Sequence, residues 1–137
     1  MTNEELIIEA KKARQMAYTP YSHFKVGAAL VTKSGKIYHG CNVENASYSV
    51  TNCAERTAFF KAVSEGEREF EKIAIVGGAE GTEADEMCAP CGVCRQVMME
   101  FCNPEKFQII LADGKEKCVQ LFLKELLPFG FGPDNLN

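Results

Sequence analysis

Hydrophobic positions near the N-terminus recur with the spacing of an amphipathic helix. The apolar stripe consists of Leu6, Ala10, Ala13 and Ala17. Thr2 precedes this stripe, and Glu5 follows Thr2 by three residues, which is the arrangement of a capping box at the start of a helix. A proline disfavours the helical conformation in the residue before it, so we expect this helix to end ahead of Pro20.

After this helix the pattern changes to short runs of small and branched apolar residues. Residues 26–31 and 37–41 form two such runs, and the polar segment 33–36 between them contains Gly35. Two extended runs joined by a short turn predict a β-hairpin.

The rest of the chain alternates helical and extended patterns. The expected elements are a helix over 53–65, a central strand over 73–76, a helix over 91–102, strands over 107–112 and 117–119, and a short helix over 121–127. The order α-β-β-α-β-α-β-β-α predicts the α/β class, with a mixed sheet flanked by helices. Because 137 residues are the length of one domain, we expect 1–137 to fold as a single domain.

Composition and charge exclude several classes of protein. Hydrophobic residues make up 46% of the chain and charged residues 25%, as in ordinary globular proteins. The formal net charge of -4 argues against nucleic acid as a partner, because phosphates require clustered Lys and Arg. No apolar run reaches the roughly 18 residues of a membrane helix, and the acidic N-terminus is unlike a secretory signal. These features predict a cytoplasmic protein that binds neither membranes nor nucleic acid.

The seven cysteines suggest a metal site, since clustered thiols in a reducing compartment commonly bind metal or act in catalysis. Cys91 and Cys94 form a C-x2-C pair at one predicted helix start, and Cys53 stands at another. Three thiolates on a tetrahedral Zn²⁺ leave one position open, which is the pattern of a catalytic zinc site. We therefore expect one zinc ion per chain.

Charged residues accompany these cysteines. Glu55 lies two residues after Cys53, where the loose geometry of a first helical turn lets both side chains reach one point. A carboxylate in this position suits general acid and base catalysis. Arg56 and Arg95 each follow a cysteine on the same helical face, so both are expected to donate hydrogen bonds to sulfur and offset its charge.

Other interpretations of the cysteines stay open on these residues alone. A C-x2-C pair also occurs in structural zinc sites, and Cys88 could complete such a site as a fourth ligand. Cys88, Cys91 and Cys94 could also begin an iron–sulfur motif, although Cys102 follows too far along the chain for one. The other cysteines are expected to be small core residues or unreactive thiols.

Two motifs together carry a family resemblance. Cys-Ala-Glu-Arg at 53–56 and Pro-Cys-Gly-Val-Cys-Arg at 90–95 match the zinc deaminase signature in its three-cysteine form. The chain resembles the small, homotetrameric cytidine deaminases, from residues 21–29 to residues 126–128. The resemblance implies a three-layer α/β/α fold with a five-stranded mixed sheet, and subunits that share their pockets.

The resemblance also implies an activity. Zinc would be held by Cys53, Cys91 and Cys94, and Glu55 would move protons. The reaction would be hydrolytic deamination of cytidine and deoxycytidine to uridine and deoxyuridine, with release of ammonia, in pyrimidine salvage.

A nucleoside pocket is indicated by Asn42 and Glu44. They follow a predicted strand two residues apart, so their side chains point the same way in an extended segment. An amide and a carboxylate suit sugar hydroxyls, although such a pair alone is more often part of a loop surface. The resemblance implies that both hold the ribose, that Phe24 stacks on the pyrimidine, and that the backbone of Ala54 binds the base. It further implies that neighbouring subunits contribute Ala46, Tyr48 and Phe131. Phe129 is an extra aromatic in the same stretch and competes with Phe131 for this role.

Three other functions compete with cytidine deamination. A related deaminase could act on another cytosine nucleoside, such as blasticidin S. A polynucleotide-editing enzyme would need a basic channel with aromatic platforms, which the charge balance disfavours. A non-catalytic, zinc-stabilised module would hold the metal but would have no use for Glu55.

Overall fold

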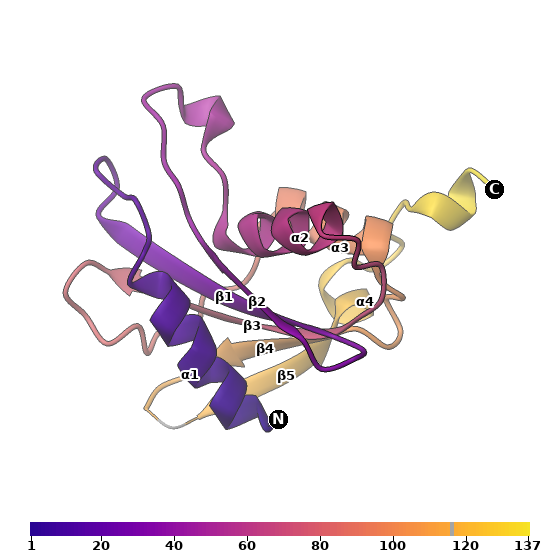
Figure 1. Cartoon of the computed structure of the whole chain (residues 1–137), viewed down its shortest axis with the longest axis horizontal. Coiled ribbons are helices and arrows are strands. Elements are labelled where there is room, and N and C mark those ends of the chain that lie inside the picture. The colour runs from indigo at the N-terminus through magenta and orange to yellow at the C-terminus, as the bar shows by residue number, and fades with distance from the viewer. Residues whose placement is uncertain (116) are drawn as a thin grey trace.

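Five strands form one mixed sheet in the order β2-β1-β3-β4-β5 (Figure 1). The computed structural model describes residues 1–115 and 117–137. The strands are β1 (Phe24–Thr32), β2 (Ile37–Cys41), β3 (Phe70–Ala79), β4 (Gln108–Ala112) and β5 (Cys118–Phe122). β3 and β4 are parallel, and the other neighbouring pairs are antiparallel. The expected five-stranded mixed sheet is confirmed, and so is the hairpin that β1 forms with β2.

Helices cover both faces of this sheet. They are α1 (Asn3–Arg14), α2 (Ala54–Ser64), α3 (Gly92–Phe101) and α4 (Leu123–Leu126), together with the 3-10 turns Tyr48–Val50 and Pro133–Asn135. α1 packs on one face, and α2, α3 and α4 pack on the other (Figure 1). The three-layer arrangement and the predicted order of elements are therefore confirmed. Within the described part of the chain, none of the helices has the length and apolar character needed to cross a membrane.

The alternation of side chains along the strands produces two separate cores. On β1, Ala28 and Leu30 are buried under α2 and α3, whereas Ala29 and Val31 are buried under α1. Successive residues of a strand point to opposite faces, so a strand with helices on both sides is apolar at every position. This explains why the inner strands are continuous apolar runs in the sequence.

Element boundaries follow the sequence pattern except where pairing across the sheet extends a strand. β3 spans Phe70–Ala79 instead of the predicted 73–76, because it pairs with β1 over nearly its whole length. β5 continues to Phe122, which pairs with Gln108 of β4, so α4 begins at Leu123. At the N-terminus the capping box is confirmed: the backbone N–H of Glu5 donates to Thr2 Oγ1 at 3.1 Å.

Two glycines let helices approach the sheet closely. A Cβ atom at Gly27 would lie 2.1 Å from the carbonyl oxygen of Ala10 in α1, and one at Gly40 would lie 2.2 Å from that of Ala54 in α2. No side chain fits at these distances. Because Ala54 is the first residue of α2, the contact at Gly40 also sets where α2 begins above the sheet.

Gly27→Ala is expected to destabilise the protein, because the added methyl group must push α1 away from β1. We expect the free energy of unfolding to fall by about 2 kcal/mol or more, measured by chemical denaturation. Gly92→Ala is the matched control, since a Cβ at Gly92 has no atom within 4 Å. Equal stability of the Gly27 and Gly92 variants would contradict the close packing of α1.

Candidate metal centre and active site

Three cysteine sulfurs meet where α2 and α3 begin. Cys53 and Cys91 are the residues immediately before these helices, each with an extended backbone, and neither side chain caps its own helix. Cys94 lies in the first turn of α3 and is buried. The three sulfurs lie within 4.8 Å of one another, and Cys53 Sγ and Cys91 Sγ are 3.8 Å apart.

This cluster has the dimensions and chemistry of a zinc site. Sulfurs bound to tetrahedral Zn²⁺ at about 2.3 Å are separated by about 3.8 Å, which is the distance between Cys53 and Cys91. Both helices direct the positive end of their dipole toward the cluster, which stabilises thiolates. Three sulfur ligands leave the fourth position of zinc free for another molecule.

Hydrogen bonds around Cys53 favour its thiolate form. The thiol of Cys94, Arg56 and the thiol of Cys91 all donate to Cys53, and together they lower its pKa to about 5 despite its partial burial. The Arg56 contact joins Nη2 to Cys53 Sγ at 3.3 Å. The pKa of Cys94 is raised instead, because its thiol donates a hydrogen bond to Cys53 and is itself buried. The expected hydrogen bond from Arg56 to sulfur is thus present.

Glu55 is a buried acid beside this cluster. It is the second residue of α2 and is only 5% exposed. Burial raises the pKa of Glu55 to about 7, and the negative charge of Cys53 contributes in the same direction. A carboxyl group with this pKa can both accept and release a proton near neutral pH.

Arg95 differs from its expected arrangement. Its Nε donates to the carbonyl oxygen of Pro90 at 2.8 Å, and its Nη1 donates to that of Leu126 at 2.7 Å. These bonds go to backbone oxygens rather than to sulfur. They tie the start of α3 to the end of α4, so Arg95 acts on the position of Cys91 and not directly on its charge.

Cys88 lies beside the site but outside the three-sulfur group. A Cβ at Gly77 would be 2.7 Å from Cys88 Sγ and 3.2 Å from the ring of Phe24, so these three residues pack together. Burial raises the pKa of Cys88 to about 11, and the charges of Glu55 and Cys53 add to this effect. Cys88 therefore stays protonated, unlike Cys53.

The other cysteines have no polar role in this region. Burial raises the pKa values of Cys41, Cys102 and Cys118. None of the seven cysteines, all of which are described, forms a disulfide.

Asn42 and Glu44 bind the segment that carries Phe24. Asn42 Oδ1 accepts from the backbone N–H of Val26 and its Nδ2 donates to the carbonyl oxygen of Phe24, both at 2.9 Å. Glu44 Oε1 accepts from the backbone N–H groups of Tyr21 and Ser22, each at 3.1 Å. Both side chains are half-buried, whereas Val43 between them is exposed, in agreement with the predicted alternation.

Sequence reasoning missed the role of Ser22 in this network. Its hydroxyl donates to Glu44 Oε2 and accepts from the backbone N–H of Phe24 at 3.0 Å. A serine that accepts from an N–H two residues later is a recognised turn pattern, which is the only local signal that could have indicated this contact.

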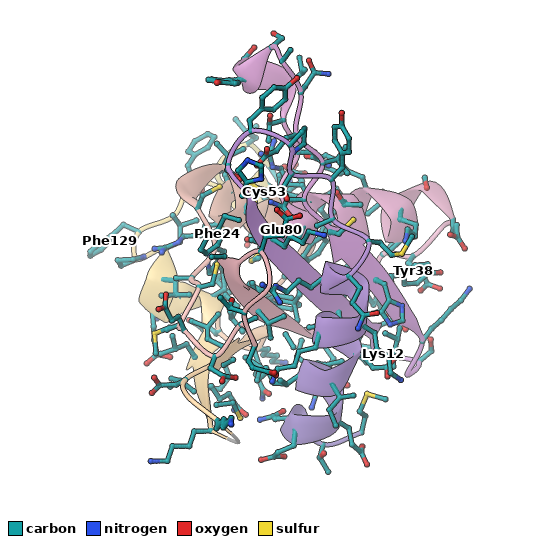
Figure 2. The ribbon with its side chains drawn as sticks, turned by 90° about the vertical axis from the view of Figure 1, so that its left-hand side faces the viewer. Lys12, Phe24, Tyr38, Cys53, Glu80 and Phe129 are labelled. Carbon is teal, nitrogen blue, oxygen red and sulfur yellow. The ribbon has the colours of Figure 1, made fainter. Side chains whose placement is uncertain are left out.

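The residues expected to serve neighbouring subunits lie on the surface of this chain. Tyr48 is 75% exposed and packs edge-on against Tyr21 with ring centres 6.0 Å apart. Ala46 is also exposed, and Phe131 is 57% exposed. Phe129 is fully exposed and projects away from the rest of the chain (Figure 2).

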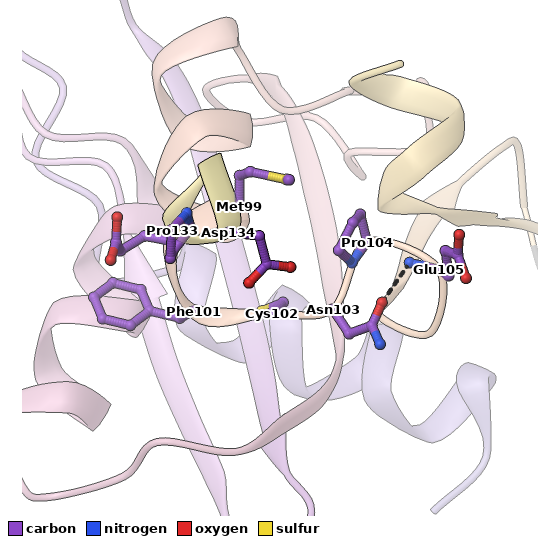
Figure 3. Close-up of a pocket in the computed structure, with 9 residues that line it drawn as sticks. Met99, Phe101, Cys102, Asn103, Pro104, Glu105, Pro133 and Asp134 are labelled. Carbon is purple, nitrogen blue, oxygen red and sulfur yellow. Dashed lines mark hydrogen bonds between the residues drawn. The ribbon is translucent and has the colours of Figure 1, made fainter. Parts of the chain in front are cut away.

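A separate hollow of about 580 Å³ lies between the end of α3 and the C-terminal 3-10 turn (Figure 3). Its walls include Met99, Cys102, Asn103, Pro104, Pro133 and Asp134. It contains none of the residues predicted for the site, so we do not assign it to the metal centre.

Comparisons with known proteins agree with this geometry. The family model of the cytidine and deoxycytidylate deaminase zinc-binding region matches residues 1–110. A protein of Sporosarcina psychrophila called cytidine deaminase is 51% identical over 137 residues, covering 100% of this chain and 96% of that protein. The crystal structure of a cytidine deaminase from Burkholderia pseudomallei aligns with a TM-score of 0.86 and 51% identity, covering 96% of this chain and 100% of that chain. A blasticidin-S deaminase of Bacillus cereus is 34% identical over 130 residues, covering 93% of this chain and 90% of that protein.

Replacing one cysteine of the cluster should remove the metal. We expect Cys91→Ala to lose nearly all bound zinc, because two remaining thiols hold the ion far more weakly. Cys88→Ala is the matched control and should keep about one zinc per chain, measured by elemental analysis. Zinc loss in the Cys88 variant would instead make Cys88 a ligand and the site structural.

Proposed function

The chain belongs to the cytidine deaminase family, and from this membership we propose that it hydrolyses cytidine and deoxycytidine to uridine and deoxyuridine with release of ammonia. The observation that carries this proposal is the buried carboxyl group of Glu55 beside a three-sulfur cluster. Such a cluster suits a catalytic metal, and the acid beside it suits proton transfer. One domain spanning 1–137 would carry the metal ligands and Glu55 of each site.

Cys53, Cys91 and Cys94 would hold the zinc ion. When bound, zinc supplies Lewis acidity that activates a water molecule near neutral pH. The hydrogen bond from Arg56 to Cys53 and the two helix dipoles offset the negative charge of the three thiolates.

Glu55 moves the protons of the reaction. Its pKa of about 7 leaves it partly ionised at neutral pH, so it can take a proton from the attacking water and pass it to N3 of cytosine. The water oxygen bonds to C4. Glu55 then transfers the second proton of that water to the amino nitrogen, the C4–N bond breaks, and ammonia leaves. The product has gained one water molecule and lost one ammonia molecule.

The nucleoside would lie against residues at the start of β1 and the end of β2. Phe24 would stack on the pyrimidine, the backbone of Ala54 would bind the base, and Asn42 and Glu44 would hold the ribose. Two features support this arrangement. Phe24 packs beside Cys88, and the charge of Glu55 raises the pKa of Cys88, so Phe24 lies in the neighbourhood of Glu55. Asn42 bonds directly to the backbone of Phe24.

Neighbouring subunits would complete each pocket in a homotetramer with one zinc ion per chain. Ala46, Tyr48 and Phe131 would reach across the interfaces. Their exposure supports this role, because a single chain leaves these side chains without cover. The position of Phe129, which is fully exposed, makes it the competing aromatic.

A second candidate substrate is blasticidin S, because the Bacillus cereus blasticidin-S deaminase is also similar over most of its length. We favour cytidine since the relatives with 51% identity are called cytidine deaminase. We also assign the enzyme to pyrimidine salvage. The unpaired cysteines support a location in the cytoplasm, where thiols stay reduced.

Glu55→Gln tests the mechanism. The amide keeps the shape of the side chain but cannot carry a proton, so we expect kcat for cytidine to fall by about 1,000-fold while zinc stays near one per chain. The exposed Glu105→Gln is the matched control and should leave kcat unchanged. Activity within tenfold of the wild type would exclude Glu55 as the proton carrier.

The same ammonia-release assay, run on cytidine, deoxycytidine, cytosine and blasticidin S, tests the substrate. We expect the two cytosine nucleosides with a free ribose or deoxyribose to react fastest. Faster release from blasticidin S would support that alternative. A zinc-loaded protein that releases no ammonia from any of them would be the non-catalytic module.

Arg56→Gln tests the charge balance of the cluster. Loss of the positive charge leaves the sulfurs more negative, which raises the pKa of nearby acids. We expect roughly tenfold slower turnover at pH 7 and a pH–rate profile moved to higher pH. Arg56→Lys should show a smaller displacement, and an unchanged profile in the glutamine variant would contradict the charge argument.

A further inference from the structure

Ser22 occupies the junction between the proposed ribose-binding residues and the base-stacking Phe24. Its hydroxyl oxygen accepts from the backbone N–H of Phe24 at 3.0 Å, and its hydroxyl hydrogen goes to Glu44 Oε2. A hydroxyl has a single hydrogen to donate. Because the Ser22 oxygen accepts from Phe24, its hydrogen points away from that N–H and toward Glu44 Oε2.

The hydrogen bonds of Glu44 leave one acceptor position for a ligand. A carboxylate offers about four lone-pair positions on two oxygens. Oε1 accepts from the backbone N–H groups of Tyr21 and Ser22, which uses both of its positions. Among the described residues 1–115 and 117–137, Oε2 accepts only from the Ser22 hydroxyl, which leaves one of its lone-pair positions for a ligand.

Space lies beside this free position. A hollow of about 370 Å³ is bounded by Tyr21, Ser22, Glu44, Tyr48 and Thr51. The hydrogen bond from Ser22 is also the main reason that the pKa of Glu44 lies below its usual value, so the carboxylate is charged at neutral pH. A charged oxygen with one open position is a strong acceptor for a sugar hydroxyl.

The backbone around Ser22 is well anchored. His23 has a left-handed backbone with φ of 55°, which folds the segment so that Ser22 reaches the N–H of Phe24. The carbonyl oxygen of His23 accepts from the backbone N–H of Glu80 at 2.7 Å. Ser22 is therefore anchored by its bond to Phe24 at the start of β1, and the adjacent His23 is anchored by Glu80, the residue that follows β3.

We propose that Ser22 is a positioning residue that fixes Glu44 Oε2 for a hydrogen bond from the sugar hydroxyls of the nucleoside. This inference rests on the proposed function, because it concerns how the same site selects a nucleoside with a hydroxylated sugar. Without the Ser22 hydroxyl the carboxylate can rotate, and Oε2 no longer has a defined direction. Ser22 itself touches no reacting atom.

The test compares Ser22→Ala with the wild type on two substrates. With cytidine we expect KM to rise about tenfold and kcat to change less than threefold, because binding to the sugar is affected and the reacting atoms are not. With 2′,3′-dideoxycytidine, which lacks both hydroxyls, we expect less than a threefold change in kcat/KM. Ser22→Thr keeps the hydroxyl and should restore KM for cytidine to within threefold of the wild type.

Ser64→Ala is the matched control, since its hydroxyl bonds to the carbonyl oxygen of Lys61 at the far end of α2. It should leave both substrates unaffected. An equal loss of kcat/KM on cytidine and dideoxycytidine in the Ser22→Ala variant would overturn the proposal and indicate a general structural role. Failure of threonine to restore KM would also overturn it.

Calorimetric binding of uridine separates this inference from the proposed reaction, because it requires no turnover. We expect Ser22→Ala to bind uridine about tenfold more weakly than the wild type. Equal affinity would overturn the role of Ser22 even in a protein that deaminates cytidine. Conversely, if the wild type releases no ammonia but Ser22→Ala binds uridine about tenfold more weakly than the wild type, the reaction is overturned and the role of Ser22 is supported.

Discussion

Everything at this site depends on two helices beginning at the same point. β3, α3 and β4 form a crossover between parallel strands, which places the start of α3 at the carboxyl end of β3. α2 reaches the same place because Gly40 lets its first turn rest directly on β2. A residue with a bulky side chain at Gly40 would lift the start of α2, and Cys53 would leave the other sulfurs. The metal centre is therefore a consequence of backbone packing as much as of cysteine spacing.

The electrostatics of the cluster follow from the same arrangement. Three thiolates outweigh the charge of one Zn²⁺, so a site made of sulfur alone would oppose the release of a proton. Here the two helix N-termini and the guanidinium of Arg56 oppose that excess negative charge. At Glu55 the protonated form is favoured instead, because burial in the first turn of α2 raises the pKa of its carboxyl group. One helix start thus favours a thiolate at Cys53 and a protonatable acid two residues later.

The sequence predicted the parts of this structure that depend on local pattern. The capping box of Thr2, the order of elements and the grouping of Cys53, Cys91 and Cys94 could all be inferred from spacing, because helix and strand periods and helix starts are local properties. Contacts set by distant segments could not. Arg95 has the right helical spacing to reach a cysteine, yet the carbonyl oxygen of Leu126, 31 residues away, competes for its guanidinium. The length of β3 was likewise hidden, because it depends on pairing with β1.

The contacts of the polar residues in the proposed sugar site also could not be predicted from local sequence pattern. Alternation along an extended segment correctly places Asn42 and Glu44 on one side, but it does not say what they bind within the chain. Most of their hydrogen-bonding capacity is used by the segment from Tyr21 to Val26. The proposed ribose contacts and the proposed platform for the base thus belong to one hydrogen-bonded unit rather than to two independent sets of side chains. Asn42 in particular bonds to the backbone of both Phe24 and Val26, so a substitution of Asn42 is expected to affect the proposed base platform as well as the proposed sugar contacts.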